Sequence, residues 1–108
     1  MKHDVPSMQA LLTAAIAAGN AAVAHKRDGY PCGFAYVNIK PARGPFVNYL
    51  KQRGIGRVDS YHGGYTLSSY DCCNFNGQNM DTKEDGVRAF ADVIKAAGVN
   101  CTTYSRLD

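Results

Sequence analysis

The sequence predicts an α+β fold in which two helices pack on one face of a four-stranded sheet. The clearest strand pattern occupies residues 32–40, where small or β-branched residues alternate with aromatic ones. A helical pattern, two alternating segments around Gly63-Gly64, a second helical pattern and a last alternating segment follow in that order. The resulting order is a split βαβ unit, so we predict a ferredoxin-like βαββαβ sandwich with an extra N-terminal helix.

Length and composition are those of one globular domain. The chain has 108 residues, of which 45% are apolar and 19% charged, which excludes a wholly disordered protein. Its net charge of +3 permits an anionic partner without requiring one. No apolar run approaches the roughly 18 residues that span a bilayer, so we expect no membrane partner. We divide the unit into an N-terminal helix and linker, residues 1–31, and a βαββαβ domain, residues 32–108.

The first predicted helix follows a loose tail, Met1 to Val5, and begins at Pro6. It is rich in alanine, the best helix former, and ends near the basic residues 25–27. A secretory signal is the alternative, because Ala22-Val23-Ala24 resembles a signal-peptidase site. Polar interruptions of the apolar stretch argue against this alternative, under which the cysteines would form disulfides.

The strand over residues 32–40 separates its side chains onto two faces. Gly33, Ala35, Val37 and Ile39 share one face, and their small or branched shapes suit packing beneath helices. The other face carries two aromatic rings that this packing does not explain. In a βαββαβ sheet the first and third strands are central, so we place this strand at the centre. The residues of the second face are Phe34, Tyr36 and Asn38.

Turn and cap residues predict the remaining elements. Gly54 is placed to end a short helix, and Gly63-Gly64 indicates a two-residue hairpin turn. Asp81 with Glu84 resembles a capping box at the start of the last helix. We therefore expect a helix over 45–53, strands over 57–62 and 65–70, a polar loop over 71–80, a helix over 81–97 and a strand over 99–107.

Alternation can be carried across all four predicted strands. With a two-residue turn, His62 opposes Tyr65 and Val58 opposes Ser69, and opposed residues share a face. The face away from the helices then gathers aromatic and arginine side chains. Single-stranded nucleic acid uses such a surface, because rings stack on bases and guanidinium groups meet phosphates. The predicted binding residues on this face are Phe34, Tyr36, Arg57, Tyr61, Tyr70, Tyr104 and Arg106.

Basic residues near the second helix predict a further binding edge. They follow the central strand closely in sequence and could contact phosphates. They could equally be the solvated rim of a small domain. The residues of this edge are Lys40, Arg43, Lys51 and Arg53, together with Arg57.

Two other occupants compete for the aromatic face. The N-terminal helix has an apolar stripe that must be buried, and we expect this face to be its place. A second copy of the chain could cover the face instead. A homodimer that binds a metabolite between its subunits is a further alternative.

The segment from Gly33 to Ile39 resembles the RNP1 motif of RNA-recognition motif (RRM) domains. Glycine and alanine alternate with Phe34 and Tyr36 as in that motif. The segment departs from the family at Cys32, where the motif has a basic residue, and at Ile39, where it has an aromatic one. It also lies on the first strand, whereas the family carries the motif on the third. The resemblance implies a similar surface rather than membership of the family.

The remaining chemistry-bearing residues predict no catalytic centre and no cofactor. The four cysteines lack zinc-site spacing, so we expect no metal and a reduced, cytoplasmic protein. Cys72 and Cys73 precede a helix N-terminus, which can activate a thiol. A pairing of this loop with His62 would make a cysteine-dependent enzyme. The two flank opposite ends of one predicted strand, however, so we expect His62 to be a solvated turn residue.

Several short blocks resemble small bacteriophage proteins of unassigned function. They are the strand beginning Cys32-Gly33-Phe34, the turn Tyr61-His62-Gly63-Gly64, parts of residues 83–91 and the ending 105–108. The resemblance implies a phage or prophage origin and a host cytoplasm. Together with the open face, it predicts a non-enzymatic binding module whose partner is a host or phage protein or single-stranded nucleic acid.

Overall fold

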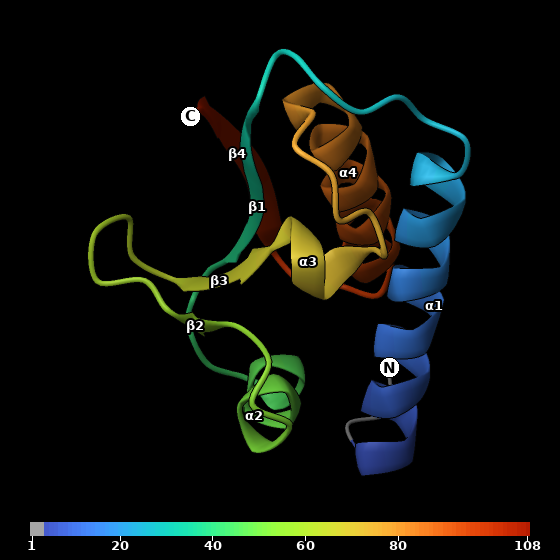
Figure 1. The fold of residues 1–108 in the computed structure, drawn as a ribbon. Coiled ribbons are helices and arrows are strands. Elements are labelled where there is room, and N and C mark those ends of the chain that lie inside the picture. Colours follow the sequence, from blue (N-terminus) through green and yellow to red (C-terminus); the bar gives the residue numbers. More distant parts are fainter. Residues whose placement is uncertain (1–3) are drawn as a thin grey trace.

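The computed structural model describes residues 4–108 and is an α+β fold with a four-stranded antiparallel sheet, which confirms the predicted class (Figure 1). Residues 1–3, which begin the predicted tail and include His3, lie outside the described residues. The strand order is β2-β3-β1-β4. The elements are α1 Val5–Val23, β1 Gly33–Ile39, α2 Pro45–Gln52, β2 Arg57–Val58, β3 Tyr65–Ser68, α3 Ser69–Cys72, α4 Met80–Ala96 and β4 Cys101–Leu107.

The central strand is β1, as its sequence predicts. It pairs with β4 along its whole length and with β3 along its second half. Ala35, Val37 and Ile39 are buried in the core, where Leu67 and Phe90 also lie. Their small or branched shapes allow α4 to pack closely on the sheet, which is why this half of the alternation faces the helices.

The predicted hairpin between β2 and β3 is wrong in its register and its turn. Val58 pairs with Tyr65 rather than Ser69, a shift of four residues, and the chain from Asp59 to Gly64 forms a loop. The cause is the Asp59 carboxylate, which accepts the backbone N–H groups of Tyr61 and His62 and so removes them from a strand ladder. Because the shift is even, each strand keeps the predicted residues on each face.

The third strand is also shorter than predicted. It ends at Ser68, and Tyr70 lies in the one-turn helix α3 rather than on the sheet. The Asp71 carboxylate accepts both the backbone N–H of Ser68 at 3.0 Å and its hydroxyl at 3.3 Å. These two bonds from Ser68 to Asp71 cap α3 and start a helix where the alternation predicts continued strand.

Helix α4 begins before the predicted Asp81–Glu84 box. Its N-cap is Asn79, whose side chain accepts the backbone N–H of Thr82 at 2.8 Å. The amide of Asn79 also donates to the carbonyls of Gly29 and Tyr30, 3.3 Å away in each case. Asn79 therefore ties the linker to the helix start, a role that no local pattern reveals.

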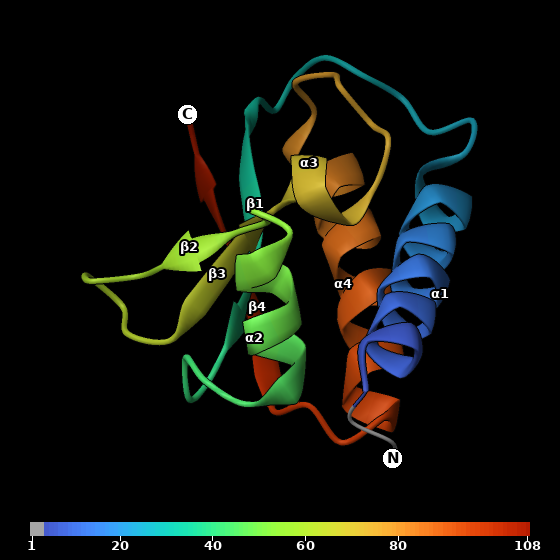
Figure 2. The ribbon, with the colours of Figure 1, turned by 90° about the horizontal axis from the view of Figure 1, so that it is seen from below.

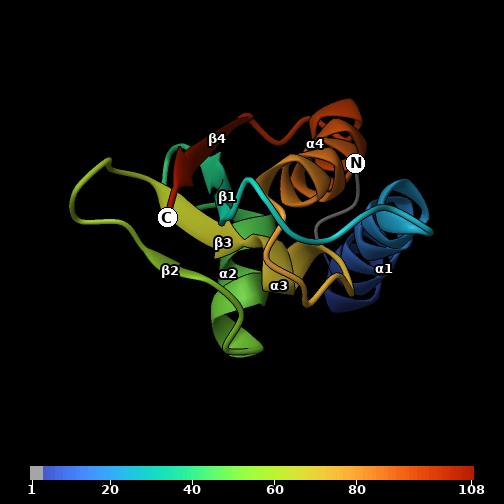
Figure 3. The same ribbon diagram turned by 45° about the horizontal axis from the view of Figure 1, so that its top comes forward.

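Helix α1 packs against α4 and forms a layer beyond it, away from the sheet (Figures 1 and 2). The expectation that α1 covers the aromatic face is therefore wrong. Small residues permit close packing around α1: a side chain at Gly86 of α4 would crowd Val23 of α1, and one at Gly19 would overlap the carbonyl of Cys72 in α3. Within residues 4–108, no helix lies over the other face of the sheet (Figure 3).

Lys83 of α4 closes the edge of β1 that β3 leaves unpaired. Its side chain is fully buried, and Nζ donates to the Gly33 carbonyl at 2.8 Å and to the Tyr70 hydroxyl at 3.2 Å. The ammonium also lies 5.1 Å from the ring centroid of Phe34 and 5.2 Å from that of Tyr70. Lys83 thus replaces the missing strand with a charge-assisted bond and two cation–π contacts.

None of the helices in the described part of the chain has the length and apolar character needed to cross a membrane.

Candidate nucleic-acid interface

Two stacked tyrosines occupy the middle of the uncovered sheet face. Tyr36 of β1 and Tyr104 of β4 are directly paired across the strands, with ring centroids 4.9 Å apart and planes inclined by 23°. Both rings are partly exposed. Cross-strand pairing holds the two rings in place, so the face presents a preformed aromatic surface.

A hollow of about 480 Å³ adjoins this pair. Two arginines line it, Arg57 from β2 and Arg106 from β4. Neither has a carboxylate within 4 Å among residues 4–108, and the Arg106 guanidinium lies 5.3 Å from the ring centroid of Phe34. Aromatic surface and positive charge therefore meet in one concavity. The residues that line it are Tyr36, Arg57, Asp59, Tyr61, His62, Tyr104, Ser105 and Arg106.

The Asp59 carboxylate organises the loop beside this hollow. Oδ1 accepts the backbone N–H groups of Tyr61 at 2.9 Å and His62 at 2.8 Å. Oδ2 lies 3.0 Å from the Thr66 hydroxyl, 3.2 Å from Nδ1 of His62 and 3.4 Å from the Tyr104 hydroxyl. The His62 backbone N–H, with the hydroxyl of Thr66 and the N–H of Tyr61, holds the pKa of Asp59 well below its usual range. Asp59 is therefore ionised at neutral pH.

A second layer of polar groups lies beneath Asp59. Thr66 and Asn38 are 1% and 3% exposed, and the Asn38 amide donates to the Thr66 hydroxyl at 3.0 Å and to the Gly63 carbonyl at 2.8 Å. Burial raises the pKa of the neighbouring Tyr104 hydroxyl, which keeps it protonated as a donor. The loop thus rests on a connected and buried polar network.

We expect Asp59→Asn to lower the free energy of unfolding at neutral pH, and to lower it by a smaller amount in acid. A carboxylate whose folded pKa is depressed contributes stability that is present above its unfolded pKa and is lost as the pH falls below it. Urea unfolding of the wild type and the variant at about pH 6 and about pH 2.5 measures this, since the unfolded value is near 3.9. The gap between the two proteins should narrow in acid.

The matched control is Asp92→Asn, which changes an exposed carboxylate on α4. Its difference from the wild type should be small at both pH values. A constant gap between the wild type and Asp59→Asn from neutral pH to acid would contradict the proposed role of the ionised carboxylate.

The hollow gathers five of the predicted binding residues but not the others. Tyr70 lies on α3 and its hydroxyl accepts a hydrogen bond from Lys83 of α4. Near α2, Lys51 donates to the Ala42 carbonyl and Arg53 donates to the Tyr49 hydroxyl. These positions follow from the end of β3 at Ser68 and from the placement of α2. The five residues that meet are Tyr36, Arg57, Tyr61, Tyr104 and Arg106.

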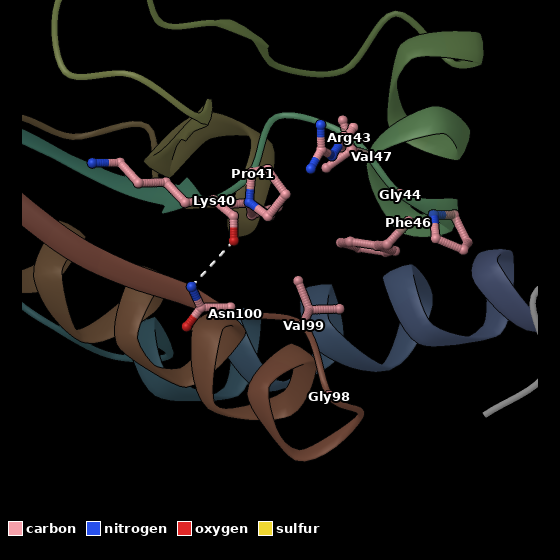
Figure 4. A pocket seen from close by; sticks show the side chains of 11 residues that line it. Lys40, Pro41, Arg43, Gly44, Phe46, Val47, Gly98, Val99 and Asn100 are labelled. Atoms are coloured by element: carbon pink, nitrogen blue, oxygen red, sulfur yellow. Dashed lines mark hydrogen bonds between the residues drawn. The ribbon is translucent and has the colours of Figure 1, made fainter.

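Lys40 and Arg43 belong to a separate, smaller hollow of about 270 Å³ between the end of β1 and α2. Apolar residues such as Phe46 and Val99 make up much of its wall, and the Asn100 amide donates to the Lys40 carbonyl at 3.1 Å (Figure 4). The side chains of Lys40 and Arg43 extend in different directions (Figure 4). Lys40 and Arg43 therefore lie outside the aromatic hollow.

The adjacent thiols of Cys72 and Cys73 are not activated. Cys72 and Cys73 are 0% and 5% exposed, and burial raises the pKa of both thiols. All four cysteines are free. Within residues 4–108, no group of three or more histidine, cysteine or acidic side chains is placed to hold a metal ion.

Sequence reasoning missed the importance of Asp59 and His62. His62 is a half-exposed turn residue, as predicted, but the sequence did not reveal that its Nδ1 lies 3.2 Å from Oδ2 of Asp59 or that its ring centroid lies 4.9 Å from that of Tyr104. The signal in the sequence is Asp59, which comes shortly before Gly63-Gly64 and can accept the backbone N–H groups of the residues that follow it. Such an aspartate favours an Asx-type turn over a two-residue hairpin.

Comparison with known proteins adds no relative: a scan of protein-family models, a search of curated proteins and a search of solved structures each returned no match to this chain.

Proposed function

We propose that the uncovered sheet face binds single-stranded nucleic acid. The observation that carries the proposal is the stacked Tyr36–Tyr104 pair, held in place beside a hollow that two arginines line. Unpaired bases can stack on the exposed surfaces of such rings, and guanidinium groups can bind the phosphates between the bases. A duplex keeps its bases stacked on one another, so this geometry favours single strands.

We also propose a ferredoxin-like classification and a phage-type accessory role. The strand order β2-β3-β1-β4, with antiparallel neighbours throughout, is compatible with a βαββαβ sandwich to which α1 adds an outer layer. The phage-type role rests on the short sequence blocks described above. A host or phage protein remains the other partner class for the same face, and the binding test distinguishes the two.

The test is the binding of a labelled single-stranded oligonucleotide at several salt concentrations. Neutralising one phosphate gives a slope of about −0.7 in a plot of log affinity against log salt. Two arginine contacts therefore predict a slope of about −1.4 or steeper, which corresponds to about sevenfold weaker binding at 200 mM salt than at 50 mM. Arg57→Ala and Arg106→Ala should each reduce the slope by about 0.7.

Lys95→Ala is the matched control, because it removes an exposed positive charge from the last turn of α4, in the helical layer. It should leave the salt slope unchanged. Absence of binding at low salt would refute the proposal, and so would equal slopes for the wild type and both arginine variants.

A further inference from the structure

The imidazole of His62 has one fixed tautomer while it is neutral. Nδ1 lies 3.2 Å from Oδ2 of Asp59, and an ionised carboxylate can only accept a hydrogen bond. Nδ1 must therefore carry the proton, which leaves the lone pair on Nε2. The side chain of His62 is about half exposed and lines the hollow, so a bound molecule can reach it.

The support beneath this ring exceeds what the turn needs. The two backbone N–H groups on Oδ1 of Asp59 suffice to form the loop. Oδ2 is oriented separately, by the buried Thr66 hydroxyl and the Tyr104 hydroxyl, and faces the imidazole. Rings of Tyr61 and Tyr104 flank His62, each with its centroid 4.9 Å away. The ring is thereby held in one orientation, as a proton acceptor requires.

The surroundings of His62 indicate a phosphodiester substrate. Arg57 and Arg106 line the same hollow and can each bind a phosphate of the strand, while the tyrosine pair can stack an adjacent base. RNA carries its own nucleophile, the 2′-hydroxyl, next to each phosphate. One positioned base is therefore enough to begin its cleavage, whereas DNA would need a separate nucleophile.

We propose that His62 is the general base of an RNA-cleaving site on this face, with Asp59 as its positioning residue; this inference rests on the proposed binding of single strands. Nε2 takes the proton of a 2′-hydroxyl, and the 2′-oxygen forms a bond to the adjacent phosphorus. The bond from phosphorus to the 5′-oxygen breaks, and that oxygen takes a proton from water. The products are a 2′,3′-cyclic phosphate and a 5′-hydroxyl, and no electron is transferred.

The experiment incubates the full chain with an end-labelled single-stranded RNA and identifies the products by gel electrophoresis and mass spectrometry. We expect fragments that end in a cyclic phosphate, and a rate about 10²- to 10⁴-fold lower for His62→Ala. His62→Gln should be equally slow, and added imidazole should restore part of the rate of His62→Ala, which a purely structural role would not allow. His25→Asn, which changes an exposed histidine in the linker, should cleave like the wild type.

Binding of a fully 2′-deoxy oligonucleotide, measured in parallel, separates this inference from the proposed function. A wild-type protein that binds single strands but cleaves no RNA would overturn the catalytic role and leave the binding face in place. Cleavage by His62→Ala at the wild-type rate would also overturn it. A protein that neither binds nor cleaves would overturn both.

Discussion

Lys83→Ala is expected to lower the free energy of unfolding by about 2–5 kcal/mol, as the loss of a long buried side chain does elsewhere. The stem of Lys83 is fully buried between α4 and the edge of β1, so its removal leaves a cavity. The substitution also leaves the Gly33 carbonyl without the donor that lies 2.8 Å away in the wild type. An unpaired buried carbonyl adds about 1–3 kcal/mol of that loss.

Lys83→Met separates packing from charge. Methionine fills the space of the stem but cannot donate to Gly33 or to the Tyr70 hydroxyl. It also removes the cost of burying an ammonium group, which offsets part of the lost bonding. We therefore expect a loss less than half of that caused by alanine, measured by urea or thermal unfolding.

The control for Lys83 is Lys95→Ala on the exposed side of α4, which should change stability by no more than about 0.5 kcal/mol. A comparable small change for Lys83→Ala would contradict the buried position. Equal losses for alanine and methionine would show that the hydrogen bonds, and not the packing of the stem, dominate at this edge.

The alternation of side chains predicted the central strand correctly. The errors in the neighbouring strands arose where a side chain accepts hydrogen bonds from the nearby backbone. Residues 32–40 alternate strictly, and β1 is where they predict a central strand. Asp59 and Asp71 each bind backbone N–H groups close in sequence, which ends β2 and β3 early. Hydrogen bonds from the backbone to a nearby side chain compete with the hydrogen bonds of strand pairing. A pattern of apolar residues does not indicate which of the two forms.

The position of α1 was beyond local prediction for a different reason. A helix rich in alanine is apolar on most of its surface, so its sequence does not single out one face for burial. Its position depends on close contacts that only the folded neighbours reveal, between Gly86 of α4 and Val23 of α1 and between Gly19 and the carbonyl of Cys72 in α3. From the sequence alone, the aromatic face of the sheet is an equally plausible surface for α1 to cover.

The same distinction applies to the site. Tyr36 and Tyr104 were predicted because alternation assigns faces without knowledge of the turn, and an even register shift leaves that assignment intact. The basic edge near α2 stays a prediction: Lys51 donates to the Ala42 carbonyl beside Arg43, and Arg53 donates to the Tyr49 hydroxyl, but neither side chain lines the aromatic hollow. His62 gained its significance only from Asp59, whose loop was itself mispredicted.

Tyr36→Ala and Tyr104→Ala are each expected to weaken the binding of a single-stranded oligonucleotide about 5- to 150-fold, which corresponds to one lost base stack. The two rings support one another at 4.9 Å, so removal of either also loosens its partner. Tyr104→Phe keeps the ring and loses only the hydroxyl that points to Asp59. It should bind within about threefold of the wild type if stacking carries the affinity.

Fluorescence anisotropy at one low salt concentration measures these affinities, with circular dichroism to verify folding. Tyr30→Ala is the matched control, because Tyr30 is 87% exposed but lies in the linker, outside the hollow. Wild-type affinity in both Tyr36→Ala and Tyr104→Ala would contradict a stacking role for the pair. If sedimentation instead shows a wild-type dimer that either alanine dissociates, the rings serve a second copy of the chain, because the aromatic surface that stacks a base can also bury itself against its own kind.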